Sequence, residues 1–190
     1  MWEDKRQMDV KSKHRPAYLL LVVLLLSFVF SLTVSAGEED GMPGQQPSTS
    51  ASNSRSVKPS VSGTRVIPLA VTASRQSPGG EPEMTTDGEV TTVWNAGGGP
   101  PQWIQFDFGE PTTLSEILLN VEQTPEGHTI HKIFGGPSSD KLKLLGTLDG
   151  NTQSGQWLRL KTTANDVRYL KVRTTESPSS VAWREIEVYR

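Results

Sequence analysis

Apolar and polar residues alternate along several short stretches in the second half of the chain. The sequence WIQFDF at residues 103–108 places Ile104, Phe106 and Phe108 on one face, with polar side chains between them. Residues 185–189 repeat the pattern with Ile186 and Val188 as the inner pair. A period of two is typical of β-strands that bury one face. We therefore predict a strand in each stretch, the first of them ending at Gly109.

Further strands are predicted between residues 66 and 189, separated by turns rich in Gly, Pro, Asn and Asp. Pro68 interrupts the first of them and suits an edge strand. No window combines a helical apolar period with capping residues. Besides residues 103–108, strands are expected at residues 66–73, 114–121, 129–134, 141–148, 156–161, 167–174 and 181–189, the last of which includes the alternating stretch 185–189. Many short strands at regular spacing predict an all-β fold, either a β-sandwich or a jelly roll.

The N-terminal region has a different composition. Residues 17–36 carry no charge, and this length is enough to cross a hydrocarbon layer as a helix. Positive charges concentrate in residues 1–16, which predicts a cytoplasmic N-terminus and an exported remainder. A buried core helix is the alternative, which the absence of a polar face disfavours. Two fates stay open: a retained signal anchor, or a signal peptide cleaved after Ala36.

Residues 37–64 are rich in Ser, Pro, Gly and Gln and carry few large apolar side chains. Such a segment buries too little surface to offset its ordering entropy, so we predict a disordered linker. Residues 65–190 then form one domain of common size. The predicted location is the cell membrane, with a single pass and the C-terminal domain outside, or the extracellular medium if the apolar segment is cleaved.

The composition excludes several classes of function. The net charge is −2 and no basic run occurs, so nucleic acid is not an expected partner. The chain has no cysteine, which removes thiol catalysis, disulfides and thiolate metal sites. No Gly-x-Ser-x-Gly motif is present. Carboxylates are numerous enough for a glycosidase pair, but so small a domain leaves little room for a cleft, and we predict no catalytic activity.

Five short sequences in the predicted domain resemble one family. They are VTAS, DGEVTTVW, WIQFDFG, RYLKV and WREIEVY, which begin at residues 71, 87, 103, 168 and 183. Their order and spacing are similar to the discoidin, or coagulation factor V/VIII type C, domain. That family belongs to the galactose-binding-like jelly rolls and includes the family 32 carbohydrate-binding modules. The resemblance covers residues 65–190 and implies a non-catalytic domain that binds glycans, lipid head groups or protein surfaces.

The resemblance also implies a structural calcium site, since many members bind this ion near the turn that begins at Asp87. Calcium takes six to eight oxygen ligands. The alternative is that Asp87 only stabilises its own turn while Glu185 faces solvent. Carried over by position, the ligands would be the carboxylates of Asp87 and Glu185, the hydroxyl and carbonyl of Thr92, and the carbonyls of Met84, Glu89 and Arg184.

Ligands of the resembled family meet loops at one end of the sandwich. These loops correspond here to Ser74–Glu83, Thr124–His128 and Thr175–Ser180, and none contains an aromatic residue. This departs from glycan-binding members, which usually offer a ring there. The ligand-binding candidates are therefore the polar side chains of Arg75, Gln76 and His128.

The sequence predicts two alternative functions. The first is an exported, surface-displayed binding module that recognises an extracellular or cell-wall glycan. The alternative is a cell-envelope protein-interaction or adhesion domain with no small-molecule ligand. Trp94 and Trp103 occupy positions that are core or half-buried in the family, so we expect them to pack rather than to stack on sugar.

Overall fold

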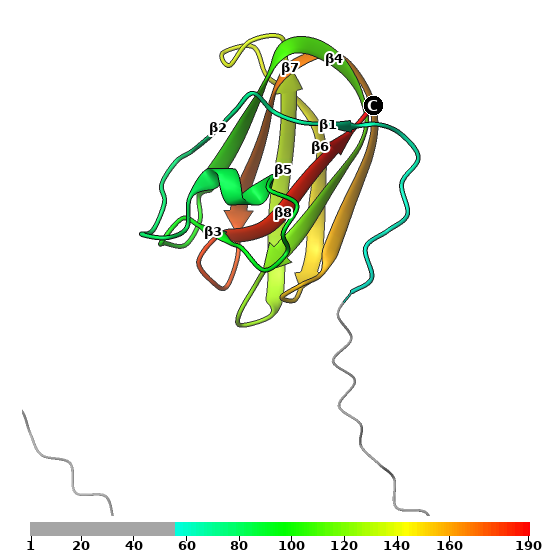
Figure 1. The fold of residues 1–190 in the computed structure, drawn as a ribbon. Coiled ribbons are helices and arrows are strands. Elements are labelled where there is room, and N and C mark those ends of the chain that lie inside the picture. Colours follow the sequence, from blue (N-terminus) through cyan, green and yellow to red (C-terminus); the bar gives the residue numbers. More distant parts are fainter. Residues whose placement is uncertain (1–55) are drawn as a thin grey trace, which may run out of the picture. The chain divides into compact units, whose positions relative to one another are not determined.

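Two long strands, β4 (Gln102–Glu122) and β7 (Trp157–Glu176), organise the fold. In the computed structural model, which describes residues 56–190, they pair with each other antiparallel along most of their length. The ladder is interrupted by register shifts between Asp107 and Glu116. Because both strands bend there, their two halves belong to two different layers of the sandwich (Figure 1).

The remaining strands extend the two layers. One layer has the order β1-β8-β4-β7 and uses the C-terminal half of β4; the other has the order β2-β4-β7-β5-β6 and uses its N-terminal half. Strand β3 pairs with β8. The bounds are Arg65–Val66 (β1), Ala70–Ala73 (β2), Trp94–Asn95 (β3), Gly127–Gly136 (β5), Lys143–Thr152 (β6) and Ala182–Tyr189 (β8), with a single 3-10 turn, η1, at Pro82–Thr85. An all-β sandwich is thus confirmed for the described residues.

The bend in β4 differs from the sequence prediction. Residues 103–108 and 114–121 were expected to be separate strands, divided at Gly109, and residues 156–161 and 167–174 were expected to be separate as well. Gly109 does adopt a positive φ of 80°. The chain nevertheless continues as a strand, because β4 pairs with β7 on both sides of Gly109. At the bend, Asp107 accepts hydrogen bonds from Arg168 Nε at 2.8 Å and from the Gly109 amide at 2.8 Å. These contacts hold the bend against the facing strand.

Pro68 divides the first predicted strand into β1 and β2, which pair with different partners. This agrees with the inability of proline to donate a hydrogen bond within a sheet. The first strand meets the last, since Arg65 is in register with Tyr189. The two ends of the domain therefore lie side by side.

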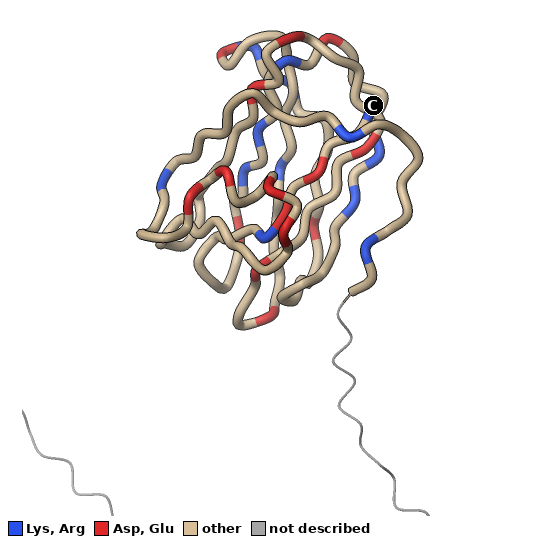
Figure 2. Tube along the Cα trace, in the orientation of Figure 1, with Lys and Arg blue, Asp and Glu red and all other residues tan. Residues whose placement is uncertain are grey.

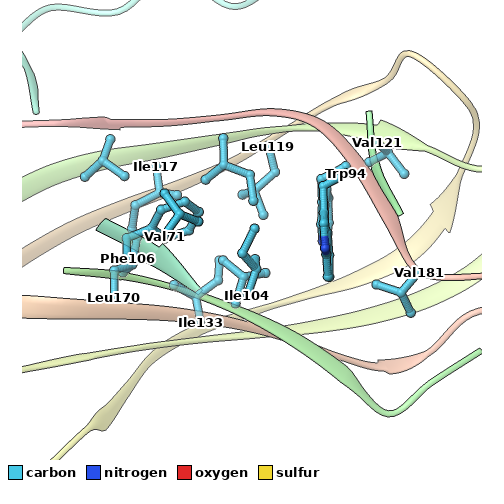
Figure 3. Packing of buried hydrophobic residues seen from close by; sticks show 14 of the residues in the cluster. Val71, Trp94, Ile104, Phe106, Ile117, Leu119, Val121, Ile133, Leu170 and Val181 are labelled. Atoms are coloured by element: carbon cyan, nitrogen blue, oxygen red, sulfur yellow. The ribbon is translucent and has the colours of Figure 1, made fainter. Parts of the chain in front are cut away.

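The core fills the space between the layers (Figure 3). Trp94 is completely buried, and its indole Nε1 donates to the carbonyl of Arg75 at 3.1 Å. Trp103 is half-buried on the outer face of β4, with Lys171 Nζ 4.5 Å from its ring centre. Both tryptophans pack against the protein, as the sequence predicts. Around Trp94, the alternating apolar positions of the strands supply Ile104, Phe106, Ile117, Leu119, Ile133, Leu170 and Ile186.

The described chain begins within the predicted linker. Residues 56–64 were assigned to the linker, but they contact the domain: Ser56 Oγ accepts from the Trp157 amide at 3.2 Å, and Lys58 Nζ lies 2.7 Å from Glu187. Composition did not reveal this because the anchors are single polar contacts. Residues 1–55 lie outside the described residues, including the predicted membrane segment at 17–36. Within residues 56–190, no helix is long and apolar enough to span a membrane.

Candidate functional site

Three connections gather at one end of the sandwich, where the sequence places the ligand loops. The turn after β3 lies beside the last loop, since Gly98 O accepts from the Val181 amide at 3.0 Å. The loop after β4 reaches the same loop, since Ser177 Oγ donates to Gln123 Oε1 at 3.2 Å. Residues far apart in sequence therefore share this end of the domain (Figure 1).

Arg75 and Gln76 follow β2 at this end, and both are exposed. The Arg75 guanidinium lies close to Gly98, and the Arg75 carbonyl accepts from buried Trp94. The backbone at Arg75 is thus anchored in the core while its side chain projects outward. This arrangement places an exposed cation at the rim of the loop end.

His128 opens β5 on the far side of the same end. Its Nδ1 lies 3.0 Å from Glu176 Oε1, and its Nε2 lies 2.8 Å from Asp149 Oδ1. The hydrogen bonds with Glu176 and then Asp149 raise the pKa of His128. Both ring nitrogens therefore contact carboxylates, and His128 links the end of β5 to residues of β6 and β7.

His131, three residues further on, is enclosed in the sandwich. Its ring packs edge-on against Trp183 with centroids 4.7 Å apart, and its Nδ1 lies 3.0 Å from Thr174 Oγ1. Burial lowers the pKa of His131 to about 4. The two imidazoles point to opposite faces of β5, as their spacing predicts, and cannot share a metal.

The pKa shifts of these histidines predict opposite effects of pH on stability. Unfolded His131 takes up a proton near pH 6.5, but the folded state does so only near pH 4. The unfolded state thus binds more protons between these values, and His131 reduces stability by about 3 kcal/mol as the pH falls to 4. The His128 contribution is present at low pH and is lost as pH rises through its raised pKa.

NMR titration of the imidazole resonances measures both pKa values directly. We expect His128 to titrate above 6.5 and His131 well below it. Replacing His131 with glutamine is expected to flatten the acid limb of the stability profile, while replacing His128 with glutamine leaves that limb in place. Two similar pKa values would contradict the described burial and pairing.

A second group of polar atoms lies in the loop after η1. The Thr92 hydroxyl is 2.8 Å from Asp87 Oδ2, 2.8 Å from the Glu89 carbonyl and 3.4 Å from the Met84 carbonyl. Four of the six predicted calcium ligands therefore converge on one point. Asp87 also supports its own turn, because its Oδ1 accepts from the Glu89 amide at 2.8 Å.

The two remaining predicted ligands are neighbours on β8, which passes this loop. Glu185 Oε2 accepts from the Gly88 amide at 3.3 Å, so its carboxylate lies next to the turn and does not face solvent. Arg184 donates from its side chain to the Val90 carbonyl at 3.0 Å. Figure 2 shows acidic residues along η1 and the following loop, close to β8.

Arg65 supplies the charge that balances Glu185. Its Nη2 contacts Glu185 Oε1 and also donates to the Thr86 carbonyl at 3.2 Å. Only 1% of Glu185 is exposed, and burial raises the pKa of its carboxyl to about 7, against the opposing effect of Arg65. Sequence analysis missed this ion pair. The only signal in the sequence was that Arg65, in the first strand, and Glu185, in the last strand, carry opposite charges.

The donor set fits a hard cation. Carboxylate, hydroxyl and carbonyl oxygens are the ligands that calcium takes. No cluster of three or more His, Cys, Asp or Glu that could hold a metal occurs within residues 56–190. An ion here would therefore depend on the Met84 and Glu89 carbonyls and the Thr92 hydroxyl as much as on carboxylates. It would also have to compete with Arg65 for Glu185.

The family of the chain follows from comparison with known proteins. Residues 70–187 match the model of the F5/8 type C domain, and the chain belongs to this family. No curated protein matches. Solved structures with the same fold include carbohydrate-binding modules, and others are larger chains with enzyme domains of which this chain covers only a part.

Three of these structures illustrate the similarity. Chitosan-binding module 1 of a chitosanase/glucanase from Paenibacillus sp. IK-5 has 25% identity and a TM-score of 0.57, covering 66% of this chain and 97% of the module. The CBM32 of AlyQ, solved with 4,5-unsaturated mannuronic acid, has 23% identity and a TM-score of 0.59, covering 67% and 98%. A CBM32 from Clostridium perfringens, solved with GalNAc-β-1,3-galactose, has 18% identity and a TM-score of 0.56, covering 64% and 94%.

Proposed function

We propose that this protein is a non-catalytic carbohydrate-binding module held outside the cell. The observation that carries the proposal is the F5/8 type C sandwich itself, because similar solved structures include modules crystallised with sugars or named for polysaccharides. Residues 17–36 would anchor the module in the membrane as a single pass, or be removed on secretion.

We expect a single copy of this module to bind sugar weakly. A loop end without an aromatic ring gives little stacking energy, so each contact with sugar would rest on hydrogen bonds from Arg75, Gln76 and neighbouring residues. His128 would contribute less than these two, because Glu176 and Asp149 already engage both of its ring nitrogens. Many copies on one surface would convert weak single contacts into firm attachment.

We also propose that calcium binds in the loop after η1. Met84, Asp87, Glu89 and Thr92 would supply oxygens, joined by Glu185 and the carbonyl of Arg184. The convergence of four of these groups on the Thr92 hydroxyl supports the proposal. When bound, the ion would tie the first loop of the domain to its last strand and stabilise the fold.

A glycan array probed with the full chain tests the proposed function. We expect binding to at least one class among galactose-, fucose-, glucosamine- and uronate-containing glycans, retained at physiological salt. A protein-interaction domain is the alternative, which the absence of aromatic residues from the three loops favours. Silence of the folded protein across all four glycan classes would support that alternative and contradict the proposal.

A further inference from the structure

Two unpaired sheet edges face each other on one side of the sandwich. Strand β6 ends its layer and pairs only with β5. The N-terminal part of β7 ends the other layer, where it pairs only with β4. The turn at residues 153–156 connects these edges. Edge strands leave backbone donors and acceptors without strand partners.

Two depressions with shared lining residues lie along this side, and together they are here called the β6–β7 groove. Their volumes are about 270 Å³ and about 300 Å³, and both are lined by Asn151, Thr152 and Gln156. Glu126, Gly127 and Gln153 complete the first, next to the loop end. The second continues past Asp149, Trp157 and Arg159.

A buried hydroxyl in this groove lacks a partner. Thr152 is 5% exposed, and its Oγ1 makes no hydrogen bond within residues 56–190. Leaving a buried polar atom unsatisfied costs free energy, so such atoms call for an explanation. Because this oxygen is enclosed by the protein and has almost no accessible surface, a ligand in the groove does not reach it, and the polar contacts of the groove come from the neighbouring side-chain amides.

Side-chain amides dominate the groove. Asn151 and Gln153 are exposed, and their side chains make no hydrogen bond among the described residues. The Oε1 atom of Gln156 accepts a hydrogen bond from the backbone N–H of Gln153 at 3.1 Å. The side-chain NH₂ group of Gln156 therefore stays available. An amide offers a donor and an acceptor side by side, which matches adjacent hydroxyl groups of a sugar.

The charge of the groove selects among sugars. Glu126 and Asp149 contribute carboxylates, of which Asp149 is already paired with His128, and no lysine lines either depression. The one lining cation, Arg159, is paired with Glu116. A chain of uronic acids would therefore meet like charges, whereas uncharged or amino sugars would not.

We infer that the β6–β7 groove binds a glycan chain of uncharged or amino sugars through the side-chain amides of Asn151, Gln153 and Gln156. This inference rests on the proposed function and extends it, because the groove runs along the side of the sandwich and adjoins the loop end only at Glu126 and Gly127. None of these three residues belongs to the loops in which the sequence placed the ligand.

NMR spectroscopy of the full chain, in a neutral detergent, tests the inference through side-chain amide signals. The probes are the hexamers of N-acetylglucosamine, glucosamine and galacturonic acid. We expect the first two to shift the amide signals of Asn151, Gln153 and Gln156, and the galacturonate hexamer to bind at least tenfold more weakly. The double variant Asn151→Ala/Gln153→Ala is expected to lose at least tenfold in affinity while keeping its circular dichroism spectrum.

Asn165→Ala is the matched control, since it removes an exposed amide at the bend of β4 and β7, far from the groove along both strands. We expect it to bind as the unaltered protein does. Shifts confined to Gln76 and the loops, with the double variant unaffected, would overturn the groove and leave the proposed function standing. No shift with any probe would overturn the groove, while the glycan array would still decide the function.

Discussion

Replacing Trp94 with alanine is expected to lower the free energy of unfolding by about 3–5 kcal/mol, the usual cost of removing a buried tryptophan. Trp94 has no exposed surface and sits between the two layers of the sandwich. The change leaves a cavity and deprives the Arg75 carbonyl of its indole donor. Urea titration followed by circular dichroism measures the loss.

Trp103→Ala is the matched control for this result. Trp103 is half-buried on the outer face, where it carries Lys171 above its ring. We expect its loss to cost about 1 kcal/mol, as partly exposed contacts of this kind do. Equal losses in the two variants would show that Trp94 does not occupy the core position described.

Replacing Arg65 with alanine is expected to destabilise the protein by about 3 kcal/mol in the absence of calcium, because the change leaves Glu185 buried without its cation, so that its carboxyl must either stay charged at a cost or take up a proton. Calcium is then expected to restore stability, since the ion would meet Glu185 without competition from the guanidinium. At a calcium concentration about 100 times its Kd, the recovery amounts to about 2.7 kcal/mol. Thermal unfolding with and without calcium measures both effects.

Two controls separate a metal site from a general salt effect. Magnesium at the same concentration is expected to stabilise much less, because it is smaller and keeps its own water ligands. Asp87→Asn, combined with Arg65→Ala, is expected to abolish the calcium effect. If calcium leaves the melting temperature of Arg65→Ala unchanged, the proposed calcium site is wrong.

Local pattern was enough to predict most of the strands, although it missed β3. The alternation at residues 103–108 reflects one buried face of β4, whereas in β8 the polar positions Glu185 and Glu187 are buried as well as the apolar ones. Where the observed strand boundaries differ from the predicted ones, pairing between distant strands is the reason. Gly109 reads as a strand end, but pairing between β4 and β7 on both sides of the bend keeps one strand continuous.

The candidate sites were predictable to different degrees. Asp87 and Thr92 are five residues apart, so their hydrogen bond at 2.8 Å is a local feature of one turn. The ion pair of Arg65 with Glu185 joins residues 120 positions apart and depends on the pairing of β1 with β8. The segment at residues 151–156 reads only as a turn, because a groove between two sheet edges does not show in either edge alone.

The central claim is that this domain binds carbohydrate without altering it. The most direct measurement incubates the full chain with insoluble chitosan, which matches the sugar class inferred for the groove, and follows both retention of the protein and release of reducing ends. We predict that the protein is retained, that soluble glucosamine oligomers displace it, and that no reducing ends appear beyond those in a blank. Failure to be retained, or a steady release of reducing ends, would contradict the account.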